Sequence, residues 1–231
     1  MSRLEEIRAR SNWPDLLEGQ PQHLGIAVLM TIGACALLVS SEGTFLGLSA
    51  ICWAQVSIAL ALAHQIMVAV VFRLQLHRNL MTRLLGERDM KVWAVLFLPL
   101  LAVRPLSLIA IGIADSTPIT QYQSGAMILG AALLVPAIWG MHSTLVHFTL
   151  PRALGGDHFR DEIAAMPMVN KGLFKYTSNA MYGVVFFGLW GIALLFNSWN
   201  ALVVAVFQHA YIWVHMYCTE SPDMRWIYDK S

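Results

Sequence analysis

The chain has 231 residues, of which 57% are hydrophobic and only 13% are charged, and its formal net charge is +1. A chain this apolar does not read as a soluble domain of its size, and a net charge near zero argues against a nucleic-acid partner. Because a bilayer favours helices whose backbone bonds are internal, the composition predicts an all-α polytopic membrane protein.

The first 23 residues form a polar lead-in. Ser2 to Gln22 contains Pro14 and Pro21 and lacks the apolar core that follows the short basic start of a signal peptide. We expect residues 1–23 to be cytoplasmic or interfacial, with Trp13 as a membrane-interface anchor.

Six apolar segments follow, each near the roughly 20 residues that a bilayer-spanning helix needs. They lie at about 24–40, 46–72, 92–114, 125–149, 181–197 and 199–217. Between the second and third, residues 73–91 place leucines at helical spacing among basic residues, which predicts a short interfacial helix. We expect a four-helix membrane region at 24–150 and a C-terminal region at 151–231 with a loop, a helical hairpin and a tail.

The basic residues lie on one side of this arrangement. Of the 15 Lys and Arg, 14 precede the first segment, lie in the two long loops or follow the sixth segment, while the other side carries Glu42 and Asp115. The positive-inside rule therefore places both termini and the long loops in the cytoplasm. The remaining cation, Arg104, lies within the third segment, where an unpaired charge costs ~2.5–3.5 kcal/mol. It predicts a contact to a substrate anion, an internal ion pair or a side chain that reaches the interface.

Two polar tracts stand at the two ends of the last hairpin, Gly172 to Tyr182 and Cys218 to Tyr228. Because the hairpin helices are antiparallel, both tracts return to the same membrane face and assemble one site. The loop at 151–180 adds the pair Gly155-Gly156 to that face.

These residue types suit S-adenosylmethionine. The ammonium group and the ribose hydroxyls of this cofactor need a carboxylate as partner. Glycine residues let the cofactor come close to backbone groups, and aromatic side chains bind its adenine ring and its sulfonium. The cofactor-binding candidates are Gly155, Gly156, Asp157, Tyr176, Asn179, Tyr182 and Glu220.

The stretches Gly172–Gly183 and Tyr211–Tyr228 resemble the C-terminal half of phosphatidylethanolamine N-methyltransferases, and more widely the family that includes isoprenylcysteine carboxyl methyltransferases. That family shows Arg-His-Pro-x-Tyr at the start of one helix and a Glu-Glu or Glu-Pro signature after the next. Here the first falls on Ser178-Asn179-Ala180-Met181-Tyr182, where only the tyrosine matches, and the second on Thr219-Glu220-Ser221-Pro222. Asn-x-Met-Tyr favours the phospholipid branch.

The resemblance implies transfer of a methyl group from S-adenosylmethionine to the amine of a phospholipid, phosphatidylethanolamine or its methylated forms, at the cytoplasmic leaflet. The amine has a pKa of roughly 10 and must lose a proton before it attacks. The candidate catalytic residues are His158, Glu220 and Asp223, and the candidate substrate-binding residues are Arg104 and His215. Membrane lipids are the expected partners, and the oligomeric state stays open.

Two alternatives remain open. One is a membrane methyltransferase for another acceptor, such as a prenylcysteine carboxylate or a small thiol. The other is a haem-binding or transport protein that uses the histidines within the apolar segments, although pairs spaced by five and six residues do not share one helix face. Those histidines are His142, His147, His209 and His215. The three cysteines predict neither a disulfide framework nor a metal site.

Overall fold

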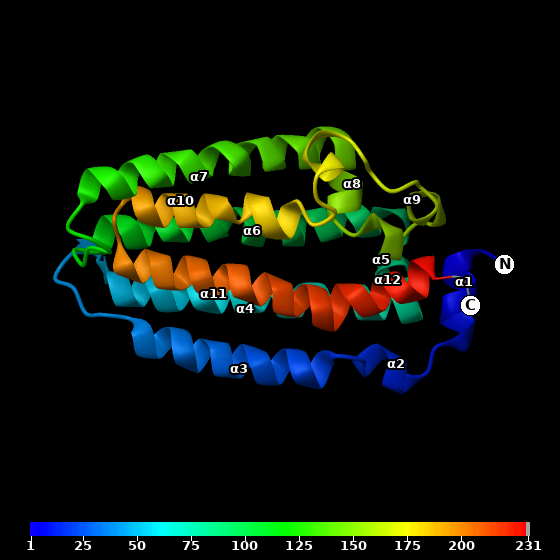
Figure 1. Cartoon of the computed structure of the whole chain (residues 1–231). Coiled ribbons are helices and arrows are strands. Elements are labelled where there is room, and N and C mark those ends of the chain that lie inside the picture. Colours follow the sequence, from blue (N-terminus) through cyan, green and yellow to red (C-terminus); the bar gives the residue numbers. More distant parts are fainter. Residues whose placement is uncertain (230–231) are drawn as a thin grey trace.

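The computed structural model describes residues 1–229 and forms a bundle of helices that run side by side along one axis (Figure 1). The all-α prediction is confirmed. The six predicted segments correspond to α3 (Gln20–Leu37), α4 (Ala50–Arg78), α6 (Asp89–Ala114), α7 (Gln123–Ser143), α10 (Phe187–Leu195) and α11 (Trp199–His215). A small antiparallel hairpin of β1 (Thr44–Phe45) and β2 (Leu48–Ser49) joins α3 to α4.

Within residues 1–229, four continuous helical stretches are long and apolar enough to cross a membrane: Ala50–Arg78, Leu80–Ala114, Gln123–Phe148 and Trp199–Tyr228. The stretch Met181–Leu195 is apolar but shorter. These lengths fit an integral membrane protein. The count of six spanning helices and the orientation of the termini stay predictions.

The bundle is packed around α11, which contacts α3, α4, α6 and α10. Its alanines Ala201 and Ala205 are fully buried, and so are Ala54 and Ala61 of α4. Small side chains let helix backbones approach closely, which is how helices associate where lipid removes the hydrophobic drive.

The N-terminal lead-in is an ordered part of the fold. It forms α1 (Arg3–Arg10) and α2 (Trp13–Leu17), and Ser2 begins α1 with a capping box. The buried side chains Leu4 and Ile7 pack against the end of α4 and against α12 (Ser221–Tyr228).

The predicted interfacial helix at 73–91 is wrong in its boundaries. Residues 73–78 continue α4, because no helix breaker occurs before Asn79, whose left-handed backbone (φ +55°) ends the helix. Asn79 alone separates α4 from α5 (Leu80–Leu85), and the short turn η1 (Gly86–Arg88) follows. As a result Arg73 lies buried inside the bundle instead of at its surface.

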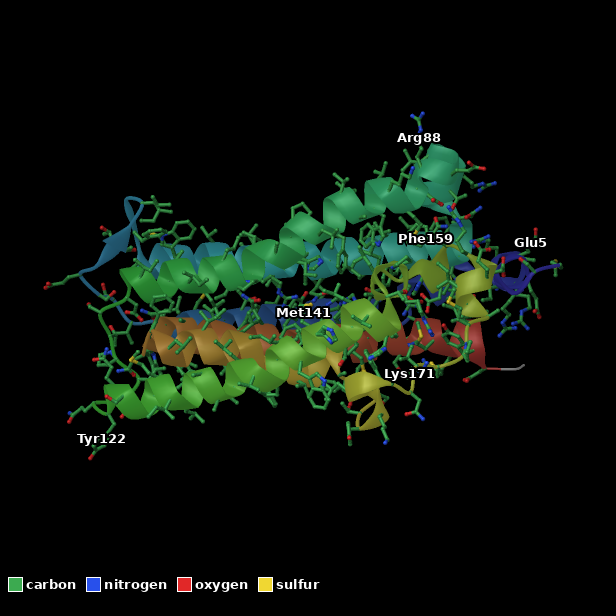
Figure 2. The ribbon with its side chains drawn as sticks, turned by 90° about the horizontal axis from the view of Figure 1, so that it is seen from above. Glu5, Arg88, Tyr122, Met141, Phe159 and Lys171 are labelled. Carbon is green, nitrogen blue, oxygen red and sulfur yellow. The ribbon has the colours of Figure 1, made fainter. Side chains whose placement is uncertain are left out.

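Most irregular segments gather at the end of the bundle that holds α1 and α12 (Figure 1). Figure 2 shows Phe159, Lys171 and Glu5 at or near this end and Tyr122 at the opposite one. The segments between α7 and α10 are η2 (Thr144–Phe148), α8 (Leu150–Ala153), η3 (Gly156–His158), α9 (Asp161–Ala164), η4 (Gly172–Lys175) and η5 (Met181–Val185), while η6 (Met216–Glu220) joins α11 to α12. We call this end the loop-rich end.

Candidate functional site

A cavity of about 620 Å³ extends from the loop-rich end into the bundle. Its walls are mostly apolar and aromatic, with Phe72 of α4, Phe97 of α6 and Phe148 of η2 among them. Residues from α4 and α6 line one part, and residues from α7 onwards line the rest. An apolar cavity with a few convergent polar groups is the usual form of a small-molecule site.

Most of the predicted site residues meet at this main cavity. Those that line it are Arg104, Gly155, Asp157, His158, Asn179, Tyr182 and Glu220. Four others do not line it: Gly156, Tyr176, His215 and Asp223. Tyr176 is 72% exposed and packs on Trp139, so the structure places it outside the cavity wall.

Glu220, in the second polar tract of the last hairpin, contacts Tyr182 in the first tract. The Tyr182 hydroxyl donates a hydrogen bond to Glu220 Oε2, and His215 Nε2 lies 3.4 Å from Glu220 Oε1. His215 is completely buried behind the carboxylate. The antiparallel layout expected from the sequence therefore holds, and Glu220 presents a carboxylate to the cavity with a phenol and an imidazole as neighbours.

His158 stands between two carboxylates. Its Nδ1 lies 2.9 Å from Asp157 Oδ1, and its Nε2 lies 3.2 Å from Asp223 Oδ2. Asp223 also pairs with Arg73, whose Nη1 is 3.0 Å from Asp223 Oδ1, and the Tyr228 hydroxyl donates to Asp157 at 3.0 Å. These five residues form a buried ion cluster that ties α4, η3 and α12 together. Two cations and two anions leave it formally neutral.

The cluster shifts both titrations in η3. Burial by itself lowers the pKa of His158, but Asp157 and Asp223 outweigh it and raise the pKa to about 10. Burial likewise favours protonated Asp157, yet the charge and hydrogen bond of His158, together with the Tyr228 hydroxyl, hold the pKa of Asp157 below its usual value. Because each ring nitrogen of His158 faces a carboxylate, the imidazole is held as a cation at neutral pH.

Gly155 allows η3 to approach α4. Its φ is +72°, and a Cβ at this position would contact the ring of Phe72. Phe72 itself stacks on His158 with ring centroids 4.1 Å apart. Only glycine combines this left-handed backbone with so close an approach. Space alone constrains Gly156, since a Cβ there would lie 2.6 Å from the carbonyl oxygen of Pro151.

Arg104 lines the main cavity from α6. Its Nε donates to Gln208 Oε1 at 2.7 Å, and its guanidinium lies 5.0 Å from the Phe186 ring centroid. The Nη2 atom of Arg104 is buried and has no hydrogen-bond partner among residues 1–229. The same holds for both ring nitrogens of His64, another residue that lines the cavity. Two of the alternatives predicted for Arg104 do not hold. No ion pair involves it in the described part of the chain, and its side chain does not reach the interface, because the residue is only 3% exposed.

Three short π-helical segments border the main cavity, namely η2, η5 and η6. They supply Phe148, Tyr182 and Glu220 respectively, and each follows or precedes a regular helix. A π-helical turn is wider than an α-helical turn and often occurs at functional sites. Sequence reasoning gave no sign of these segments.

Sequence reasoning also missed Arg73, Tyr228 and His64 as members of the site. For Arg73, one signal was available: no helix breaker separates Phe72 from Asn79, so α4 had to continue past the predicted boundary. For Tyr228 and His64 no local pattern pointed to the cavity. Among the described residues, no group of three or more His, Cys, Asp or Glu side chains could hold a metal ion.

Comparison with known proteins finds a family match in the C-terminal part of the chain. Residues 125–231 match the family model of the phospholipid methyltransferases. The chain is 28% identical over 108 residues to a phosphatidylethanolamine N-methyltransferase of Scheffersomyces stipitis, and 29% identical over 105 residues to one of Clavispora lusitaniae. These stretches cover 46% and 44% of this chain. The resemblance of the C-terminal tracts is confirmed.

The matched stretch spans only 12% of the length of either relative. No solved structure matches the chain. The match begins at the start of α7, so it includes Gly155, Tyr182 and Glu220 but leaves out α4 and α6, which line the cavity with His64 and Arg104.

Proposed function

We propose that this protein transfers a methyl group from S-adenosylmethionine to the amine of a phospholipid, phosphatidylethanolamine or its methylated forms, at the cytoplasmic leaflet. One observation carries the proposal: the family-matched region lines the cavity with Glu220, Tyr182 and Gly155, the types of group that a sulfonium cofactor and an amine need.

The residues present fit the cofactor. Glu220 and Asp157 offer carboxylates to an ammonium group or a ribose diol, and the tight Gly155 turn brings backbone to the wall. The aromatic side chains Phe72 and Tyr182 suit an adenine ring or a sulfonium through stacking and cation–π attraction. When bound, the cofactor supplies an electrophilic methyl group.

Glu220 is our proposed proton acceptor. It reaches the cavity, the Tyr182 hydroxyl donates to its Oε2, and His215 Nε2 lies 3.4 Å from its Oε1. An acceptor amine that approaches Glu220 would give up its proton there, which frees the lone pair for attack. A mostly apolar wall limits water around the reacting groups, and the positioning of two reactants supplies much of the remaining acceleration.

We propose positioning roles for His158 and Asp223, which the sequence put forward as catalytic. An imidazole that is already cationic cannot take a proton, and Asp223 does not line the cavity. Their ion cluster would instead fix Asp157 and the Gly155 turn against α4.

Arg104 and His64 would bind the anionic part of the acceptor. Buried donors without a partner are costly, and the phosphate diester of a phospholipid would satisfy them. The residues of α4 and α6 lie outside the family match, so the acceptor is the part of the proposal that needs its own assay.

The assay incubates purified protein with methyl-labelled S-adenosylmethionine and one lipid at a time. The panel contains phosphatidylethanolamine, its mono- and dimethylated forms, a prenylcysteine and a small thiol. Label in an amine phospholipid is the expected result. Label only in the prenylcysteine or the thiol would assign the alternative acceptor, and absence of label in every compound would reject the proposal.

Cofactor binding gives a separate test of the site. Titration calorimetry should show that Glu220→Ala abolishes binding of S-adenosylmethionine, because the carboxylate that holds its ammonium group or ribose is lost. Glu87→Ala is the matched control, since Glu87 is exposed on η1 and outside the cavity. Unchanged affinity in the Glu220 variant would remove Glu220 from the binding site.

A further inference from the structure

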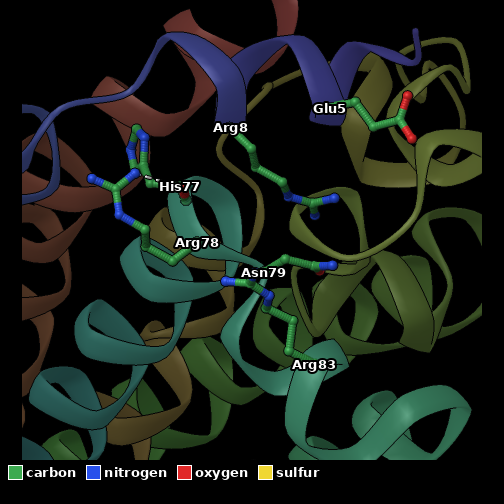
Figure 3. Close-up of a pocket in the computed structure, with 6 residues that line it drawn as sticks. All are labelled: Glu5, Arg8, His77, Arg78, Asn79 and Arg83. Atoms are coloured by element: carbon green, nitrogen blue, oxygen red, sulfur yellow. Dashed lines mark hydrogen bonds between the residues drawn. The ribbon is translucent and has the colours of Figure 1, made fainter.

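A second pocket lies at the loop-rich end, between α1 and the junction of α4 with α5 (Figure 3). Its volume is about 400 Å³. It shares no lining residue with the main cavity, and its lining residues are Glu5, Arg8, His77, Arg78, Asn79 and Arg83. We call it the arginine pocket.

Arg8 brings unused donors to the arginine pocket. Its Nε and Nη2 are buried and have no hydrogen-bond partner within residues 1–229. Burial lowers the pKa of Arg8, although Asp161 and Glu5 oppose that effect. Burying guanidinium N–H groups without an acceptor costs free energy. An anion with several oxygen atoms would supply the missing acceptors.

The other residues make the pocket electropositive. Arg78 is fixed, because its Nη1 donates to the carbonyl oxygen of Ser11 and its guanidinium lies 5.3 Å from the Trp13 ring centroid. Figure 3 shows the Arg8 side chain reaching from α1 towards Asn79 and Arg83 on the opposite wall.

The charges that face the pocket do not cancel. Three guanidinium groups line it against one carboxylate, Glu5. Asp161 also acts on Arg8, but its Oδ1 already accepts a hydrogen bond from the backbone N–H of Leu4. Arg side chains arranged in this way bind phosphate through several parallel N–H bonds.

The position of the pocket favours a ligand near the lipid boundary. The adjoining helix α5 leaves Leu84 71% exposed, and Trp13 is 69% exposed beside Arg78. Exposed apolar and indole side chains beside cations are typical of a membrane interface.

We propose that the arginine pocket binds a phosphate-bearing anion, which either the headgroup of an anionic phospholipid or a soluble phosphate can supply. Arg8 and Arg83 donate hydrogen bonds to the phosphate from opposite walls of the pocket, and Arg78 adds a fixed positive charge. The site is independent of methyl transfer, so its test stands whatever the main cavity catalyses.

The experiment compares the 231-residue protein with three variants in detergent. Arg8→Gln/Arg83→Gln removes both gripping side chains, and Arg83→Gln alone changes an exposed residue that does not hold the fold. Arg88→Gln is the matched control, because Figure 2 shows Arg88 projecting outwards from the start of α6 and it does not line the pocket. Thermal unfolding of each variant checks its fold.

Two probes distinguish the source of the phosphate. Native mass spectrometry measures retention of phosphatidylglycerol against phosphatidylcholine, and titration calorimetry measures binding of inorganic phosphate. We expect binding of at least one probe, roughly tenfold weaker or more in the double variant and unchanged in Arg88→Gln, because charge-assisted hydrogen bonds are lost. Arg83→Gln should weaken it by a smaller factor.

Retention of phosphatidylglycerol alone supports a lipid ligand, and binding of inorganic phosphate alone supports a soluble one. Binding of neither probe overturns the proposal. So does equal binding by the folded Arg83→Gln and Arg88→Gln variants.

Discussion

At the scale of single residues, the buried ion cluster explains why polar groups persist inside an apolar protein. Each charge in it has an opposite charge within 3.2 Å, from Arg73 through Asp223 and His158 to Asp157. Since a buried ion pair brings little net stability but is costly to break, the cluster favours one arrangement of α4, η3 and α12 over others.

The first prediction concerns pH. The folded-state pKa of His158 is about 10, above the 6.5 of an unperturbed imidazole. The stability contributed by its protonated form is therefore fully present below pH 6.5 and is lost as the pH rises to about 10. Unfolding midpoints measured across this window should fall for the wild type and fall less for His158→Gln. Parallel curves for the two proteins would contradict the assignment.

The second prediction concerns the pair Arg73 and Asp223. Asp223→Leu leaves a buried guanidinium without its counter-charge, and we expect a loss of about 3–5 kcal/mol in the free energy of unfolding. Denaturant titration in mixed micelles measures it. In the double variant Arg73→Met/Asp223→Leu much of this loss should be recovered, because no unpaired charge then remains. A double variant no better than Asp223→Leu would argue against the ion pair as the cause.

At the scale of elements, the main cavity depends on where regular helices stop. Three π-helical segments surround it, and the η3 turn approaches α4 through Gly155. Such irregular segments have no clear signature in residue pattern, since their geometry follows from packing between distant parts of the chain.

The third prediction follows from this turn. Gly155→Ala introduces a methyl group at φ +72° against the Phe72 ring, so η3 must shift away from α4. We expect this shift to weaken cofactor binding by roughly tenfold or more. Gly33→Ala is the matched control, because Gly33 lies within α3 with nothing near its Cβ position. Calorimetric titration with S-adenosylmethionine separates the two. Equal affinities would show that the turn does not shape the site.

Sequence reasoning predicted the elements that depend on apolar runs. The six apolar segments, the hairpin of the last two and the meeting of Tyr182 with Glu220 were all accessible from hydrophobicity and helix direction. The buried position of Arg73 could not be predicted in this way, because a cationic residue at the end of an apolar run is typical of a helix boundary at the membrane surface. Its partner Asp223 lies 150 positions later in the chain, and no local pattern connects the two.

At the scale of the whole molecule, both parts of the chain build the site. The family-matched part supplies Glu220 and Tyr182, and the earlier part supplies the wall with Arg104 and His64. Under the proposed function, the first of these parts would bind the cofactor and the second would select the acceptor.

The fourth prediction concerns orientation. Figure 2 places Arg88 and Tyr122 at opposite ends of the bundle. In a variant whose three native cysteines are replaced by serine, Arg88→Cys should react with a membrane-impermeant maleimide from the cytoplasmic side only, and Tyr122→Cys from the other side only. Labelling of both positions from one side would reject the predicted topology.

The contact of α1 with α12 has a consequence for biosynthesis. Arg3 donates to the carbonyl oxygens of Trp226 and Asp229, and Leu4 and Ile7 pack beside Ile227. Because α1 precedes α12 by more than 200 residues in the chain, its apolar face stays uncovered during synthesis until α12 has been made. Until then α1 is open to chaperones or to lipid, and the ion cluster lacks Asp223, which belongs to α12. A chain truncated before α12 should therefore show no transfer of label in the lipid assay proposed above.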